Sequence, residues 1–559
     1  MLHYQILLII GLLLTIIGLH MLSAKIHVSY PILLVLGGLA ISEVPGVPHI
    51  TLDPEFVFLI FLPPLLYEAA WYTSWHDFWR LKAPIGVQAF GLVFFTSMVV
   101  AYFVNGFIPG FPLAVGFLLG GIISPPDAVT ATSVLDGLDA PKDAVTILEG
   151  ESLINDASSL IVYQFALAAV LTSQFEWADA GRQLLWVALG GIGIGVALAQ
   201  GICFIRGRLP TTPSIDTSLT LISPYLFYLT AESLESSGVL AVVAGGLFLS
   251  YRSHEFLTAK SHVQSGSVWS TLSFLLNGFV FLLIGLQLPV VVEGLGGVSL
   301  GRALLYAVAI SLLTIAVRII WVFPTAYLLR MLPSYPQNKA AAGWKMEMLV
   351  AWAGMRGVVS LASALAIPLT LRDGRPFPDR DLILFITFCV ILVTLVLQGL
   401  SLPRLIQWLQ FEPDLKTGTP DQQRESMSMR LALAAREYLE LKYADECHQI
   451  PMFQRLRTSY EWTISTAFIA SGSSAQSQDA RELGDRYKQA LLEMIDVQRK
   501  ELILARREGA YDHDLTLERE DELNLEEARL LRSEEEDAEE DVLAEAEAEA
   551  GTPERQDGN

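Results

Sequence analysis

Residues 120–132 read GGIISPPDAVTAT and interrupt an apolar run that extends from about 111 to 133. Pro125 and Pro126 lack the backbone N–H that a helix needs, so the run cannot continue as one regular helix. At membrane depth, irregular backbone is tolerated only where protein buries it or where it lines a cavity, and its free carbonyls can bind a cation. Asp127 follows the break directly, where it could cap the second half-helix or bind an ion. The segment therefore predicts a broken transmembrane helix, with both roles open for Asp127.

The apolar runs around this break indicate the fold class. Of the 559 residues, 52% are apolar, and they are concentrated before residue 411. A spanning helix needs about 20 mostly apolar residues, which predicts an all-α polytopic membrane protein with about thirteen spans. The expected spans are 4–22, 30–42, 54–72, 84–104, 111–133, 148–173, 183–205, 215–231, 236–250, 269–291, 301–330, 345–370 and 381–409.

The chain becomes polar and acidic after the last of these runs. We expect a transmembrane domain over residues 1–410 and an acidic cytoplasmic tail over residues 411–559, with helical segments and a disordered end. Much of the formal net charge of −22 lies in the tail, which argues against nucleic acid as a partner. Cys203, Cys389 and Cys447 form no metal or disulfide pattern, and the chain shows no nucleophile–base set. Neither an enzyme nor a cofactor site is expected.

Loop charge predicts the orientation in the membrane. Basic residues favour one set of loops by about two to one, which places the C-terminus in the cytoplasm and the N-terminus outside. No Lys or Arg precedes the first apolar run, so we interpret it as a transmembrane helix rather than a signal peptide. The sequence thus indicates a multi-pass protein of the cell membrane.

A second polar segment, residues 148–159, reads LEGESLINDASS and leads directly into an apolar stretch. On a helix, Ser152, Asn155 and Asp156 share one face because they are three and four residues apart. Their hydroxyl, amide and carboxylate oxygens suit Na⁺, Li⁺ or K⁺, and the acid can instead hold a proton. The alternative is a polar cluster whose members only satisfy one another. We favour Asp156 as the residue that carries the ion, because an acid inside a membrane is costly.

A third segment, residues 351–362, reads AWAGMRGVVSLA and places Arg356 between glycines in an apolar run. This pattern predicts a second interrupted helix. An intramembrane arginine needs a partner, and Arg318 is a second such arginine. Glu151 lies off the Asp156 face and is a natural partner for one of them.

The two breaks fall in the fifth and twelfth expected spans. Because these numbers differ by seven, the two spans run in opposite directions, as inverted-topology repeats with crossed broken helices require. We expect spans two to seven and eight to thirteen to form the repeats. Glu68 follows Pro63 and Pro64 near a span end, where we favour an interfacial position over one that lines the ion path.

Four motifs together resemble one family. They are SPPDAVTA at 124–131, EGESLINDASS at 149–159, FLLIGLQLP at 281–289 and MRGVVSLA at 355–362. They resemble the monovalent cation:proton antiporters of the first CPA family, the NhaP-type and sodium/proton exchangers, over about residues 5–410. The resemblance implies an NhaA-like fold, a homodimer, and a mobile core domain that gives alternating access. It also implies a secondary antiporter that exchanges Na⁺, K⁺ or Li⁺ for H⁺, which we expect to be electroneutral.

The resemblance also implies roles for residues of the ion site. Asn155 and Asp156 match the family's ion-site pair, and Ser152 and Asp127 match polar positions beside it. A monovalent cation would then be bound by Asp156, Asp127 and Ser152, and the same Asp156 would hold the proton in its absence.

The resemblance extends to the buried charges. Glu151 matches an acid that pairs with a core arginine, for which Arg318 is the first choice, and Arg356 matches the other core arginine. At Pro126 this chain departs from many relatives, which carry Thr there, so a backbone carbonyl is kept but a hydroxyl is lost. The further candidates for the ion path are Glu68, Pro126 and Thr130.

Two other classes of function are the alternatives. A cation channel would use the broken helices as a filter, but Pro-Pro-Asp lacks a filter's run of carbonyl ligands. A membrane sensor would instead signal through the tail.

Overall fold

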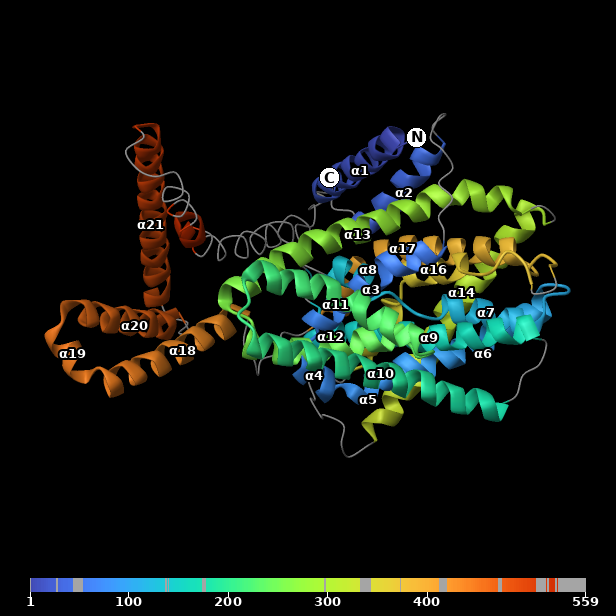
Figure 1. Cartoon of the computed structure of the whole chain (residues 1–559), viewed down its shortest axis with the longest axis horizontal. Coiled ribbons are helices and arrows are strands. Elements are labelled where there is room, and N and C mark those ends of the chain that lie inside the picture. Colours follow the sequence, from blue (N-terminus) through green and yellow to red (C-terminus); the bar gives the residue numbers. More distant parts are fainter. Residues whose placement is uncertain are drawn as a thin grey trace, which may run out of the picture. The chain divides into compact units, whose positions relative to one another are not determined.

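The computed structural model describes residues 2–26, 29–43, 54–135, 138, 140–172, 177–295, 298–331, 343–371, 374–411, 420–470, 475–508, 519, 522–527 and 530. Within these residues the regular structure is helical, apart from an isolated β-bridge between Thr370 and Pro376. The chain forms two compact units, Met1–Phe411 and Glu412–Asn559 (Figure 1).

The first unit contains a helix or a pair of half-helices at each of the expected spans. Its elements are α1 (Leu2–Ile26), α2 (Tyr30–Ser42), α3 (Pro54–Tyr72), α4 (Trp75–Arg80), α5 (Lys82–Gly86), the π-helix η1 (Val87–Leu92), α6 (Val93–Phe107), α7 (Leu113–Ile123), α8 (Ala128–Leu135), α9 (Lys142–Thr172), α10 (Trp177–Arg208), α11 (Pro213–Ser233), α12 (Gly238–Phe256), α13 (Ala259–Glu293), α14 (Leu300–Arg330), α15 (Trp344–Trp352), α16 (Val358–Leu365) and α17 (Arg380–Leu409).

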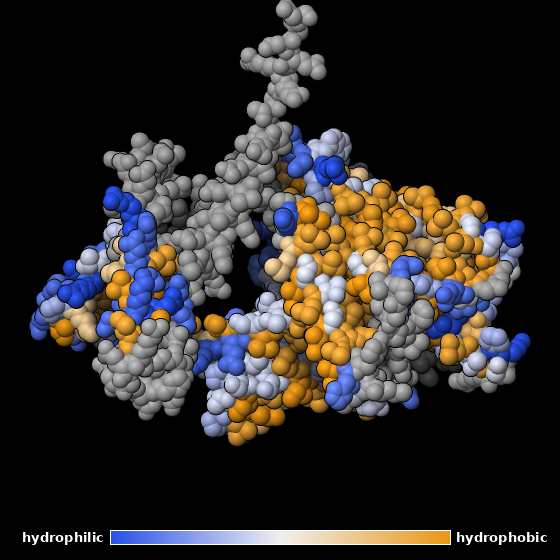
Figure 2. All heavy atoms as spheres, turned by 90° about the horizontal axis from the view of Figure 1, so that it is seen from above, coloured by the Kyte–Doolittle hydropathy of each residue, from blue (hydrophilic) through white to orange (hydrophobic). Residues whose placement is uncertain are grey.

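The composition of these helices suits a membrane. Among the described residues, eight helical segments are long and apolar enough to cross one, and α2 and the apolar part of α12 are shorter. On the face of this unit that Figure 2 shows, most of the surface is apolar, and hydrophilic residues lie mainly towards its edges. On α1, Leu7, Leu14 and Met21 are 64–69% exposed, as lipid-facing side chains would be. The prediction of an all-α polytopic membrane protein is confirmed.

The helices of this unit pack into two groups, and small residues allow the helices of each group to approach closely. In the panel group (α2, α3 and α10–α13), a Cβ at Gly38 of α2 would collide with the backbone of α13, and one at Gly285 of α13 with the backbone of α2. In the core group (α6–α9 and α14–α17), a Cβ at Gly120 of α7 would likewise collide with the Ser97 backbone of α6. Helices in such close contact pack backbone against backbone, because small residues leave no side chain between them.

The packing of the panel group corrects the expected limits of the repeats. The second span, α2, packs on the tenth, α13, and the third span, α3, packs on the ninth, α12. Adding seven to span two (α2) gives span nine (α12), and adding seven to span three (α3) gives span ten (α13), so the two contacts are equivalent. The same offset of seven relates the two broken spans. The repeats are therefore spans one to six and eight to thirteen, not two to seven and eight to thirteen. Only this offset puts the break at the fifth position of both.

The second unit is a set of helices of its own: α18 (Pro420–Lys442), α19 (Ala444–Gln449), α20 (Pro451–Ala470) and α21 (Ala475–Glu508). The short α19 lies between α18 and α20 in the chain, and these two helices pack against each other. Cys447 of α19 is buried in this unit. The disordered end expected from the sequence lies outside the described residues.

Candidate ion site

The two interrupted helices cross at their breaks. Residues 124–127, between α7 and α8, and residues 354–357, between α15 and α16, are not helical. The Asp127 backbone N–H donates a hydrogen bond to the Met355 carbonyl at 2.7 Å, and Arg356 Nε donates one to the Ile123 carbonyl at 3.0 Å. The freed backbone groups of each break thus find partners in the other.

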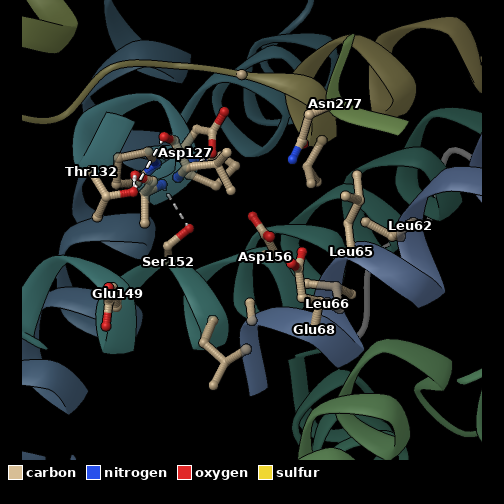
Figure 3. Close-up of a pocket in the computed structure, with 18 of the residues that line it drawn as sticks. Leu62, Leu65, Leu66, Glu68, Asp127, Thr132, Glu149, Ser152, Asp156 and Asn277 are labelled. Carbon is tan, nitrogen blue, oxygen red and sulfur yellow. Dashed lines mark hydrogen bonds between the residues drawn. The ribbon is translucent and has the colours of Figure 1, made fainter. Parts of the chain in front are cut away.

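Beside the crossing lies a cavity of about 330 Å³. The core group contributes Asp127, Ser152 and Asp156 to its wall, and the panel group contributes Glu68 of α3 and Asn277 of α13 (Figure 3). Several leucines of α3 complete the panel side. The cavity therefore joins a polar wall on the core group to a mostly apolar wall on the panel group.

Asp156 is the acid most directly aimed at this cavity. It lies near the middle of α9, is 8% exposed, and points its carboxylate into the open space (Figure 3). Within the described part of the chain, no group donates a hydrogen bond to that carboxylate. The helix ends are about 20 Å away at 1.5 Å per residue, too far for their dipoles to compensate its charge. Among the described residues, the Asp156 carboxylate therefore has neither a hydrogen-bond donor nor a nearby end of its own helix to compensate its charge.

Asp127 both lines the cavity and caps α8. One carboxylate oxygen accepts the Val129 backbone N–H and the other accepts the Thr130 hydroxyl, each at 2.9 Å. These bonds use the N-terminal groups of α8, as a capping residue does. These hydrogen bonds agree with the capping role predicted for Asp127. Asp127 also lies in the cavity wall, where an ion in the cavity could reach it.

Ser152 and Asn155 tie the break to α9. The Ala128 backbone N–H donates to Ser152 Oγ at 3.0 Å, and Asn155 Nδ2 donates to the Pro126 carbonyl at 3.1 Å. Ser152 lines the cavity, whereas Asn155 is fully buried behind it. The three polar residues of this helix face therefore differ in their contacts. Ser152 Oγ and Asn155 Nδ2 bond to the broken backbone, whereas Asn155 Oδ1 and the Asp156 carboxylate accept no hydrogen bond from the described residues.

Two glycines permit the close crossing. A Cβ at Gly357 would overlap the Asp127 carboxylate, and one at Gly354 would overlap the Arg318 side chain. Both collisions follow from proximity alone, since the φ of Gly357 is −140°, which any residue can adopt.

We expect Gly357→Ala to impair exchange strongly while the protein still folds. The methyl group must displace Asp127 or the break itself, and such overpacking costs about 1–3 kcal/mol. The initial rate of cation-driven proton movement in proteoliposomes measures the loss, which we expect to reach at least about tenfold, the equivalent of 1.4 kcal/mol. Gly193→Ala on α10, where a Cβ meets nothing within 4 Å, is the matched control. Wild-type exchange by the Gly357 variant would contradict the close crossing.

Glu151 and Arg318 meet as a fully buried ion pair. The Arg318 terminal nitrogens donate to the two Glu151 oxygens at 2.6 and 2.8 Å, and Arg318 also donates to the Val350 carbonyl. This bidentate pair joins α9 to α14 and, through Val350, to α15. It lies away from the cavity wall, so it holds core helices together.

Arg356 has a different set of partners. Its side chain donates to the Ile123 and Gly354 carbonyls, and its backbone N–H donates to Thr394 Oγ1 at 3.1 Å. Ile123 is the last residue of α7, where the helix dipole is negative. Within the described residues Arg356 makes no ion pair, so its charge is balanced by carbonyls at the helix breaks rather than by an acid.

The remaining ion-path candidates lie in different places. Glu68, for which the sequence favoured an interfacial position, is half-buried and lines the cavity. The Pro126 carbonyl accepts from Asn155, while Thr130 is buried and its hydroxyl is directed at Asp127. Asn277 was not predicted. Its only signal in the sequence is an amide in the apolar run of the tenth span.

The fold can now be compared with known families. A family model described as "Sodium/hydrogen exchanger, transmembrane" matches residues 8–408. The chain belongs to the sodium/hydrogen exchanger family. This membership confirms the family expected from the four motifs, which is a family of transporters.

Several proteins are similar to this exchanger. An uncharacterized Na⁺/H⁺ exchanger of Mycobacterium tuberculosis is 32% identical over 517 residues, which cover 91% of this chain and 93% of that protein. A sodium, potassium, lithium and rubidium/H⁺ antiporter of Bacillus subtilis is 34% identical over 414 residues, 72% of this chain and 62% of that one. The sodium proton antiporter MjNhaP1 of Methanocaldococcus jannaschii matches in structure with a TM-score of 0.57 at 20% identity, over 73% of this chain and all of that one. That match confirms the NhaP-like fold.

Proposed function

We propose that this exchanger moves Na⁺, K⁺ or Li⁺ in exchange for protons, with both bound in turn at Asp156. The observation that carries the proposal is the Asp156 carboxylate, which is buried, unpartnered among the described residues and directed into the cavity at the helix crossing. The names of the M. tuberculosis and B. subtilis relatives support the same exchange.

The two substrates exclude each other by charge. A buried carboxylate is costly to leave ionised, so it holds either a proton or a cation. Ser152 and Asp127 offer the next oxygens, and water in the cavity can supply others. Asn155 does not titrate, and if Asp156 alone exchanges its proton among the acids of the cavity, each turn would move one cation against one proton, and the exchange would be electroneutral.

Alternating access would come from movement of the core group against the panel group. The cavity reaches from Asp156 to Tyr72 and Thr73 at the end of α3, to Thr132 of α8 and to Glu149 in the first third of α9. Loop charge assigns all these ends to the cytoplasm. The arrangement described here would then be open to the inside.

Reconstituted antiport tests the proposal. Purified protein in proteoliposomes with an internal pH-sensitive dye should show proton movement when Na⁺, K⁺ or Li⁺ is added, across a series of pH values. An imposed membrane potential should leave the rate unchanged if exchange is one for one. No proton movement with any of the three cations would refute the function, and rates that follow the potential would refute electroneutrality. Currents far above carrier turnover would favour a channel instead.

We also propose that the protein is a homodimer of the cell membrane with its C-terminus in the cytoplasm. The family resemblance supports the dimer, and the bias of basic loop residues supports the orientation. Mass measurement in detergent and labelling of single cysteines placed at each terminus test these two points.

We expect removal of residues 412–559 to leave exchange intact. Among the described residues, those that line the cavity all belong to the Met1–Phe411 unit, so we do not expect exchange to need the tail. The truncated protein should show the same cation affinities in the proteoliposome assay, whereas its pH response would change if the tail regulates. Complete loss of exchange by a folded truncated protein would favour the sensor alternative.

A further inference from the structure

Asn277 is an amide whose surroundings give it no hydrogen-bond partner. It lies in the middle of α13, in an apolar stretch between Phe274 and Gly278, and is 7% exposed. Within the residues described, its side chain makes no hydrogen bond, yet it is directed into the cavity towards Asp156 (Figure 3). A buried amide without a partner is costly, so whatever occupies the cavity is what this group meets.

The chemistry of the cavity limits what that occupant can be. Facing Asn277 are Asp156, Asp127 and Ser152, which offer only oxygens. An amide oxygen is a hard, neutral ligand of the same kind, and rotation about χ2 exchanges it with the amide nitrogen at nearly the same position. A cation bound at Asp156 would therefore find a further oxygen on the opposite wall.

We infer that Asn277 is a cation ligand supplied by the panel group, one that is in reach in only one of the two access states. This inference rests on the proposed exchange at Asp156. Asp156 and Asp127 are on the core group, whereas Asn277 is on the panel group, so movement of one group past the other changes the distance from Asn277 to these two acids. The cavity is open towards the ends that loop charge assigns to the cytoplasm. Asn277 thus contributes to cation binding from the cytoplasmic side and not from outside.

The Asn277 side chain is uncharged, and this affects the proposed role as much as its oxygen does. An acid at this position would add a further titrating charge to those of Asp156, Asp127 and Glu68 in the cavity, which would change the coupling of cation to proton. An amide adds an oxygen without adding a charge. The side chain therefore tunes affinity and ion preference without changing the ratio of exchange.

Asn277→Leu tests this assignment, because leucine is of similar size and cannot bind a cation. Everted vesicles expose the cytoplasmic side, and right-side-out vesicles expose the other. With Na⁺, K⁺ and Li⁺ in turn, we expect the half-saturating cation concentration to rise about tenfold in everted vesicles, by unequal factors for the three ions. In right-side-out vesicles it should stay at the wild-type value. Asn277→Ala provides a second variant, which removes the amide without adding bulk.

Ser265→Ala is the control on the same helix, since Ser265 is equally buried but bonds to Thr217 and does not line the cavity. Stabilisation of the purified protein against heating by each cation gives a binding measurement that is independent of transport. Wild-type half-saturation on both sides, or an equal rise on both sides, would overturn the inference. If the wild-type protein itself shows no exchange, the proposed function fails. If it exchanges and Asn277→Leu changes nothing, only the inference fails.

Discussion

Asp156→Asn should reduce exchange to the level of protein-free liposomes for every cation and at every pH. Asparagine has nearly the size and shape of aspartate, so the helix crossing and the Ser152 and Asn155 contacts to the break are preserved. It cannot release or accept the proton, and it offers a cation no charge. Both halves of the cycle therefore fail together, whereas loss of a positioning residue would weaken one binding step and leave slow exchange.

The measurement is the proton-movement assay in proteoliposomes, with protection against heating by cations as a separate readout of binding. Asp143→Asn is the matched control, because it makes the same chemical change near the start of α9. Asp143 lies outside the cavity and forms an ion pair with Arg80 at 2.5 Å. We expect the control to exchange as wild type and Asp156→Asn to lose both exchange and protection. Continued coupled exchange by Asp156→Asn would show that another group carries the proton.

Local chemistry made the helices and the breaks predictable from the sequence. Length and apolarity alone located the spans, because a membrane demands helices of nearly fixed length. Pro125 and Pro126 identified one break by their missing donors, and the glycines around Arg356 identified the other. The helical period placed Ser152, Asn155 and Asp156 on one face, and the structure shows all three directed towards the crossing.

Contacts across the fold were less predictable, because a pattern shows which face a side chain occupies but not what lies opposite. The sequence predicted Ser152 and Asn155 as candidate ion ligands, and it did not show that Ser152 Oγ accepts the Ala128 N–H or that Asn155 Nδ2 donates to the Pro126 carbonyl at the break. The charge of Arg356 predicted an acidic partner, but its side chain donates to carbonyls at the helix breaks. No sequence pattern shows the partial charges of these carbonyls. Asn277 lies on a helix far from the motifs in the sequence, and only packing brings it to the cavity.

Glu151→Gln should destabilise the protein more than loss of any exposed charge. It leaves the Arg318 guanidinium fully buried among core helices with a neutral partner, and breaking a buried pair in this way costs about 3–5 kcal/mol. The expected result is a markedly lower unfolding temperature in detergent and a smaller monodisperse fraction on purification. Any protein that does fold should keep its cation preference, because the pair lies outside the cavity wall.

The double variant Glu151→Met with Arg318→Met distinguishes an unpaired charge from simple loss of contacts. Removing both charges avoids the buried cation, and methionine fills the space, so the double variant should be more stable than Glu151→Gln alone. Glu255→Gln is the control, since it breaks the Arg252–Glu255 pair, whose side chains are 38% and 50% exposed, and should barely change the unfolding temperature. If the double variant were as unstable as the single one, the Glu151–Arg318 hydrogen bonds, rather than charge balance, would be what this pair contributes to the core.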